Sequence, residues 1–204
     1  MQKTKNILRK VESYLKLQIL FLIFVILFGA YVRVTGSGAG CGRHWPLCQG
    51  KIIPPSLFEK TLIELTHRLT SGLLFIFSFF ILYIVERHLK SYKLLLKFVR
   101  LSFFFLVLEA LLGAGLVLLE HVANNSSHYR ALSMSLHLIN TYMLIGTSFI
   151  ALLLSQKNYS QKNFLWHKQL SFKIFTGVIL FILLSISGAI TALGDTLFPV
   201  TSHY

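Results

Sequence analysis

Several ionisable residues lie inside stretches that are otherwise apolar, where such side chains are costly and are therefore functional candidates. Glu64 and His67, in the segment LIELTHRLTSG, are three residues apart and would share one face of a helix. His137, in ALSMSLHLIN, lies about six residues into a second apolar stretch, and His67 lies about as deep in its own. Imidazoles that face each other from neighbouring helices can both ligate one haem iron. The spacing therefore suggests a haem site.

A structural alternative exists for each of these groups. His67 and His137 would also be explained if each ring only hydrogen-bonded a neighbouring helix. Glu109, in FFFLVLEALLGAGLVLL, lies in the middle of another apolar stretch and would be protonated or hydrogen-bonded inside a bundle. Gly113 and Gly115 follow it and would allow close helix contact. A structural role and a role in the site are both open for Glu109.

Five apolar stretches would have to position these residues. The chain has 204 residues, of which 54% are hydrophobic and only 13% charged, which is more apolar than a soluble domain. A membrane span needs about 20 residues, and these stretches are too long for the strands of a barrel. We therefore predict an all-α integral membrane protein. Its five transmembrane helices are expected at Leu17–Val32, Leu62–Val85, Leu101–Leu119, Ala131–Leu154 and Phe172–Leu193.

The net charge of +13 is distributed unevenly along the chain. Of the 20 Lys and Arg residues, 14 precede the first predicted helix, lie between the second and third, or lie between the fourth and the first turn of the fifth. Because cytoplasmic loops carry the excess of Lys and Arg, the N-terminus is predicted to be cytoplasmic and the C-terminus outside. We also expect the membrane to be a bacterial plasma membrane. The basic excess then reports topology and lipid contact, and it does not indicate binding to nucleic acid.

The first predicted helix ends in the loop RVTGSGAGCGRHWPLCQG, from Arg33 to Gly50. Cys41 and Cys48 are the two cysteines of the chain, and the predicted topology places both outside, where disulfides persist. A bond between them is favoured, and two unpaired thiols are the alternative. Their spacing is not that of a C-x-x-C redox pair.

Taken together, these segments resemble the haem A synthases, the CtaA family of cytochrome oxidase assembly proteins. GAYVRVTGSGAGCGRHWPLCQG and ELTHR match the family's G-x-x-V-R-x-T-x-S-G-x-x-C, W-P-x-C-x-G and E-x-x-H-R patterns in order, and a histidine follows early in the fourth helix. SGAITALGDTLFP, from Ser187 to Pro199, is similar to the family's exit from its fifth helix. The resemblance extends over about residues 17–200.

The resemblance implies an oxidoreductase that converts a ring methyl group of haem O to a formyl group, giving haem A for cytochrome oxidase. It implies that the substrate haem lies between His67 and His137, that Glu64 is the catalytic residue, and that Cys41 and Cys48 can form a disulfide. Haem O synthase and cytochrome oxidase subunits are the partners it suggests.

The outer loop would then lie as a lid over the outer mouth of the haem pocket. Arg33 or Arg43 would meet the haem propionates, and Trp45 with Pro46 would give a rigid apolar surface. Arg68, next to the E-x-x-H pair, would contact the propionates or the pocket. Packing of the loop alone is the alternative for each of them.

The family fold has eight helices in two similar halves, and its second half holds a haem b on another histidine pair. We therefore expect a cytoplasmic segment at 1–16, a four-helix haem-binding half at 17–155 with its outer loop at 33–60, and a cytoplasmic loop with the fifth helix at 156–204. Because the sequence stops at Tyr204, the second half is expected to be truncated, in a fragment or in a short product.

Three other functions compete with this one. A non-enzymatic bis-histidine electron carrier or assembly factor needs the same two histidines and is the main alternative. A thiol–disulfide oxidoreductase is disfavoured by the cysteine spacing. A prenyltransferase that makes haem O would need aspartate-rich diphosphate motifs, and Asp195 is the single aspartate in the chain.

Overall fold

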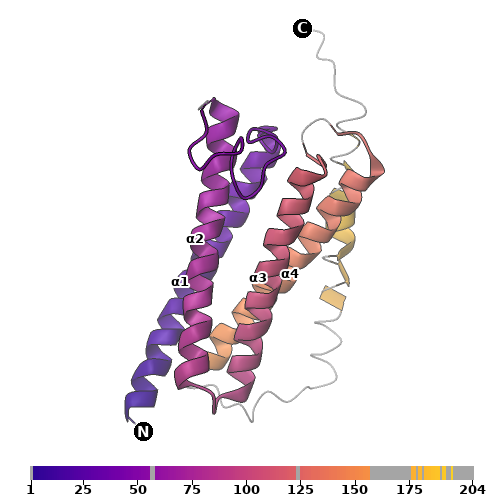
Figure 1. The fold of residues 1–204 in the computed structure, drawn as a ribbon. Coiled ribbons are helices and arrows are strands. Elements are labelled where there is room, and N and C mark those ends of the chain that lie inside the picture. Colours follow the sequence, from indigo (N-terminus) through magenta and orange to yellow (C-terminus); the bar gives the residue numbers. More distant parts are fainter. Residues whose placement is uncertain are drawn as a thin grey trace.

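The computed structural model describes residues 2–55, 58–122 and 125–156, and, between 176 and 194, residues 176–177, 179–180, 182–188, 190–191 and 194. Four helices follow one another along the chain: α1 (Gln2–Val34), α2 (Glu59–His88), α3 (Lys93–Leu118) and α4 (His128–Ser155). They run alternately up and down (Figure 1). α1 packs on α2 and α4, and α3 packs on the same two helices, so the four form a bundle.

All four helices are long and apolar enough to cross a membrane, which confirms the predicted all-α membrane fold. The described residues contain no strand beyond an isolated bridge between Cys48 and Lys51. The fifth predicted helix, Phe172–Leu193, falls largely outside the described residues. The positions described between 176 and 194 are helical, but they do not make up a full span. The described residues therefore show four membrane-spanning helices, one fewer than the five predicted.

The helices extend beyond the predicted apolar stretches. α2 and α4 each begin three residues earlier than predicted, at Glu59 and His128, and α3 begins at Lys93. The predicted N-terminal segment 1–16 is continuous with the first span, because α1 begins at Gln2. The hydrogen bonds of a helix join backbone groups and do not require apolar side chains. Helical turns made of charged and polar residues can therefore extend a helix beyond the apolar stretch from which it was predicted.

The apolar core occupies one end and the middle of the bundle. An inner cluster lies toward the short turn between α2 and α3, and its buried residues are Val11, Leu15, Ile81, Val85, Leu89, Leu95, Leu96, Val99, Ala151, Leu152 and Leu154. A middle cluster takes residues from all four helices: Leu22, Val25, Leu74, Leu106 and Leu144. Among the described residues no third cluster continues this core toward the other end, which we call the outer end.

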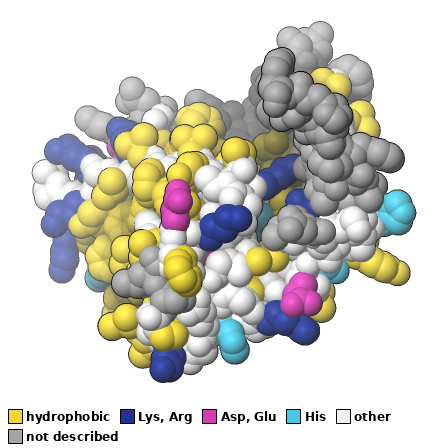
Figure 2. Space-filling view, turned by 90° about the horizontal axis from the view of Figure 1, so that it is seen from above, with side chains coloured by type: hydrophobic (Ala, Val, Ile, Leu, Met, Phe, Trp, Pro, Cys, Tyr) yellow, Lys and Arg dark blue, Asp and Glu magenta, His cyan; other side chains and the backbone are white. Residues whose placement is uncertain are grey.

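The outer end carries the loop between α1 and α2 and the connection between α3 and α4 (Figure 1). Figure 2 looks down on this end and shows acidic side chains lying close to basic ones among hydrophobic residues. One such pair, Arg43 Nε with Glu120 Oε1 at 3.4 Å, joins the two connections. Both side chains are exposed, so the pair contributes less than about 1 kcal/mol.

Candidate functional site

His67 and His137 lie at the same level of the bundle, in the outer part where the apolar core ends. Each is seven residues, or about 10 Å, outward from a leucine of the middle cluster: Leu74 on α2 and Leu144 on α4. Both helices begin three residues earlier than predicted, and the two shifts cancel. The equal depth expected from the sequence is therefore present in the structure.

A glycine on a neighbouring helix leaves room for each imidazole. A Cβ added at Gly29 of α1 would lie 3.0 Å from Cε1 of His67, closer than ordinary contact allows. A Cβ at Gly113 of α3 would lie 3.8 Å from Cε1 of His137. Phe28 also stacks on His67, with ring centroids 6.1 Å apart. A side chain at position 29 would therefore crowd the His67 ring, whereas a Cβ at position 113 would make ordinary van der Waals contact with His137.

The imidazoles have unused hydrogen-bonding capacity. Nδ1 of His67 and Nδ1 of His137 are buried and have no hydrogen-bond partner among the described residues. The two rings lie within electrostatic range of each other. Buried polar atoms are nearly always paired, so the two Nδ1 atoms call for an explanation. The structural alternative, in which a hydrogen bond to a neighbouring helix accounts for each ring, is not observed at either Nδ1.

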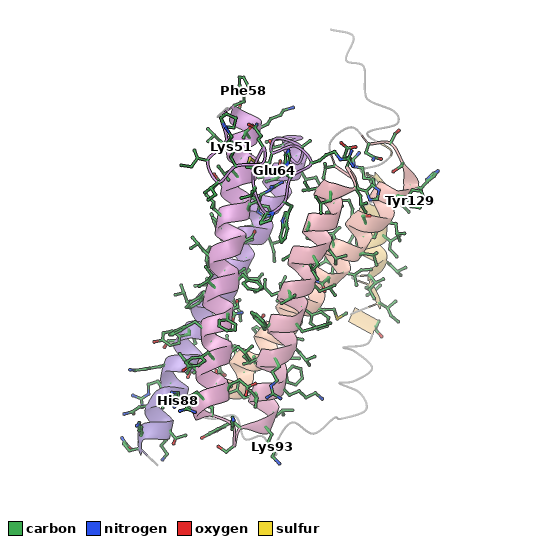
Figure 3. All side chains as sticks on the ribbon, viewed as in Figure 1. Lys51, Phe58, Glu64, His88, Lys93 and Tyr129 are labelled. Atoms are coloured by element: carbon green, nitrogen blue, oxygen red, sulfur yellow. A yellow bond between two sulfur atoms is a disulfide. The ribbon has the colours of Figure 1, made fainter. Side chains whose placement is uncertain are left out.

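Glu64 lies one turn before His67 and connects α2 to the outer loop. Its Oε2 accepts a hydrogen bond from the backbone N–H of Cys41 at 2.8 Å, and its Oε1 accepts one from Arg68. The other guanidinium nitrogen of Arg68 donates to the carbonyl oxygens of His44 and Leu47, both at 2.6 Å. Glu64 and Arg68 are both buried, with side chains 4% and 11% exposed. This ion pair therefore holds the loop over the outer end of α2. Figure 3 labels Glu64 in this part of the bundle, beside the loop.

The loop also rests directly on the first turn of α2. A Cβ at Gly40 would lie 2.4 Å from the carbonyl oxygen of Lys60, so only glycine fits at this position. The Gly40 carbonyl accepts a hydrogen bond from Thr61 Oγ1 at 2.9 Å. Cys41 and Cys48 are fully buried and joined by a disulfide in the structure. The loop is a folded cover rather than a loose connection.

Alkylation in denaturant without reductant is expected to leave Cys41 and Cys48 unmodified. The bond closes a short loop, so the chain-entropy model gives it about 2–3 kcal/mol of stabilisation. We expect this to order the loop rather than the bundle. Mass spectrometry after alkylation, with and without reductant, checks the bond, and limited proteolysis after reduction should cut the loop while α1–α4 stay intact. Free thiols in protein isolated without reductant would contradict both the bond and the predicted exterior location of the loop.

The residues expected to meet haem propionates are placed differently from one another. Arg33 Nη2 donates to the carbonyl oxygen of Gly188 at 3.3 Å. Arg68 donates through Nη1 to two carbonyl oxygens of the loop and through Nη2 to Glu64 of α2. Arg43 is exposed and pairs with Glu120, and Trp45 is 40% exposed. The structure thus brings Glu64 and Arg68 together beneath the loop and leaves Arg43 and Trp45 on its outer side.

Three polar residues near the histidines were missed by the sequence reasoning. Arg130, at the start of α4, lies within electrostatic range of Arg33 at the outer end. Asn140 and Thr141 hydrogen-bond the carboxylate of Glu109. They follow His137 by three and four residues and so share its helix face. That spacing of polar residues within a span was the signal available in the sequence.

Comparison with known proteins places the chain in a family. A 186-residue segment that makes up 90% of this chain is 41% identical to a protein of Thermus thermophilus named protoheme IX farnesyltransferase, of which it covers 30%. A 169-residue segment, 83% of this chain, is 34% identical to the haem A synthase of Bacillus cereus (strain 03BB102), of which it covers 53%. Haem A synthase of Bacillus anthracis matches to the same extent.

The chain thus spans from about a third to about half the length of the curated relatives it matches. Most of the Thermus protein lies outside the match, so its name does not by itself describe the matched segment. A family model described as cytochrome oxidase assembly protein matches residues 12–204, nearly the whole sequence. The chain therefore belongs to the COX15-CtaA family of cytochrome oxidase assembly proteins.

Proposed function

We propose that this chain forms the substrate-binding part of a haem A synthase, in which haem O is bound between His67 and His137. The observation that carries the proposal is the pair of imidazoles at equal depth, in the part of the bundle where the apolar core ends. The matches to haem A synthases support haem O as the substrate class. The oxidation of its methyl group to a formyl group is part of the same proposal.

The residues present suit a haem better than a bare metal ion. Structural zinc sites use four protein ligands and catalytic ones three, and the described residues contain no group of three or more His, Cys, Asp or Glu that could hold an ion. A haem brings four ring nitrogens of its own, so two axial imidazoles complete its coordination. When bound, the haem iron would supply the redox chemistry of the reaction. His67 and His137 would hold and orient it.

Glu64 is best suited to act as a fixed negative charge beside the substrate. Both of its carboxylate oxygens accept hydrogen bonds, from Cys41 N–H and from Arg68, so taking up a proton would disrupt contacts that hold the loop. A preorganised charge in a site of low dielectric stabilises charge that develops in the transition state. We propose that Glu64 stabilises positive charge that develops at the methyl carbon.

We also propose the orientation that the basic residues indicate. The N-terminus and the turn between α2 and α3 would face the cytoplasm of a bacterial cell, and the disulfide-closed loop would face outward. Haem O synthase and cytochrome oxidase subunits are the proposed partners. A haem b bound outside this segment, elsewhere in the whole protein, is also an expectation from the resemblance.

The proposal is tested in a host that makes haem O and lacks its own haem A synthase. The reading frame that contains this chain is expressed there, and the haems extracted from the membranes are separated by liquid chromatography. Haem A is expected to accumulate as haem O falls. The competing function, a bis-histidine haem carrier or assembly factor, predicts inserted protein with bound haem and no haem A.

A further inference from the structure

Glu109 occupies the middle of α3, and its carboxylate faces a single turn of α4. Asn140 Nδ2 donates to Oε2 at 2.5 Å, and the hydroxyl of Thr141 donates to Oε1. The same Nδ2 also donates to the carbonyl of Phe105 at 2.9 Å. Oε1 lies 3.5 Å from Nδ1 of His137. The carboxylate is thus fixed by two neighbours and directed at the imidazole.

His137 is the one cationic or potentially cationic partner of Glu109 among the described residues. The contact of 3.5 Å is longer than a hydrogen bond, and a side-chain movement of about half an ångström would close it. Nδ1 of His137 has no hydrogen-bond partner in the described part of the chain. A carboxylate inside a membrane span has a high energetic cost. If position 109 served only to pack α3 on α4, an uncharged polar residue that bonds Asn140 and Thr141 would be sufficient.

The second imidazole has no such neighbour within the described ranges. Nδ1 of His67 is buried and unpartnered there. Glu64, the nearest carboxylate along α2, directs both oxygens to Cys41 and Arg68 instead. The two histidines therefore lie at the same depth, but among the described residues only His137 has a carboxylate beside its Nδ1.

Metal-ligating histidines usually donate their second ring N–H to a carboxylate or carbonyl, which fixes the tautomer and makes the imidazole a more basic ligand. On the basis of the haem ligation proposed above, we propose that Glu109 is a positioning residue for His137. It holds Nδ1–H and directs Nε2 toward the iron. His137 is then the more strongly held axial ligand, and His67 is the one that dissociates first.

This asymmetry has a spatial consequence. His67 lies one turn from Glu64, beneath the outer loop, whereas Glu109 and His137 lie on α3 and α4. A coordination position that opens by loss of His67 would therefore be on the side of Glu64. His137, the more strongly held ligand, would lie on the side of the haem away from Glu64.

The test uses the whole chain in detergent, titrated with hemin as the probe. Glu109→Gln keeps the shape of the side chain and its capacity to bond Thr141 and Asn140, but it removes the charge. We expect the midpoint potential of the bound haem to shift to more positive values and ferric haem to bind about tenfold more weakly or worse. Glu86→Gln, which alters a carboxylate paired with Arg100 near the inner end of α2, is the matched control and should leave both values unchanged.

Double variants show whether the effect passes through His137. The shift caused by Glu109→Gln should persist in a His67→Ala background and vanish in a His137→Ala background. His137→Ala alone should also weaken hemin binding more than His67→Ala does. A shift that persists without His137, or equal losses from the two alanine variants, would overturn the proposal.

A purely structural role gives a different result. In that case Glu109→Gln lowers the melting temperature of the haem-free protein and leaves the potential and affinity of bound haem unchanged, which also overturns the proposal. If Glu109→Gln does not fold, Thr141→Val removes one support of the carboxylate and should shift the potential in the same direction by less; no shift overturns it. Failure of the unaltered chain to give a low-spin hemin complex would instead refute the proposed bis-histidine site itself.

Discussion

Replacing His67 or His137 by alanine is expected to abolish a low-spin, six-coordinate haem spectrum and to lower the amount of haem bound to the purified protein by about tenfold or more. Each substitution removes one axial ligand, and the described residues place no other histidine at the same level of α2 or α4. The measurement is absorption spectroscopy of the protein together with extracted haem per chain. The haem-free melting temperature of each variant shows whether the bundle is intact.

Matched controls are available on the same two helices. His88 is exposed at the inner end of α2, and His128 is exposed at the start of α4, so His88→Ala and His128→Ala should bind haem normally. Free imidazole added to His67→Gly should restore the six-coordinate spectrum, because it fills the position that the side chain left. Six-coordinate haem in both alanine variants of the proposed ligands would show that the site lies elsewhere.

Glu64→Gln is expected to separate haem binding from haem conversion. The amide keeps the size of the carboxylate and can still accept the Cys41 N–H bond, but it removes the negative charge. Haem should therefore bind, whereas haem A output in the haem O-producing host should fall by about a hundredfold or more, the usual cost of losing one group that stabilises the transition state. Haem O should accumulate in its place.

The buried ion pair makes a second variant necessary. Glu64→Gln leaves the Arg68 guanidinium buried without its counter-charge, and removing one partner of a buried pair costs about 3–5 kcal/mol. The double variant Glu64→Gln with Arg68→Gln removes both charges and should recover part of this stability without recovering haem A. Recovery of haem A in the double variant would assign Glu64 to anchoring the loop. Unchanged haem A in the single variant would favour the haem-carrier function.

The membrane fold and the level of the histidines could be predicted because both depend on local pattern. A run of apolar residues marks a span, and counting residues from its outer end fixes depth along a helix of known rise. The helix ends could not be predicted as well, because α3 continues through Lys93 and Lys97, which lie outside its apolar stretch. Hydropathy identifies the span and leaves the ends of the helix undefined.

The contacts around the site depend on tertiary structure, and the sequence did not reveal them. Arg68 was expected near the haem propionates, yet it donates to the carbonyls of His44 and Leu47, which are more than 20 residues away in the sequence. Every residue carries a backbone carbonyl oxygen, so a side-chain hydrogen bond to that oxygen does not depend on the type of the accepting residue. Such a bond cannot be recognised from the sequence. Glu109 was recognised as unusual, but its orientation toward His137 depends on how α3 packs on α4.

The most direct test of the central claim is the low-temperature electron paramagnetic resonance spectrum of ferric haem bound to the unaltered chain. Ligation by both His67 and His137 predicts one haem per chain and a low-spin signal typical of two axial imidazoles. That signal should become high-spin when either histidine is replaced by alanine. A high-spin signal in the unaltered chain, or a low-spin signal that survives both substitutions, would contradict the account.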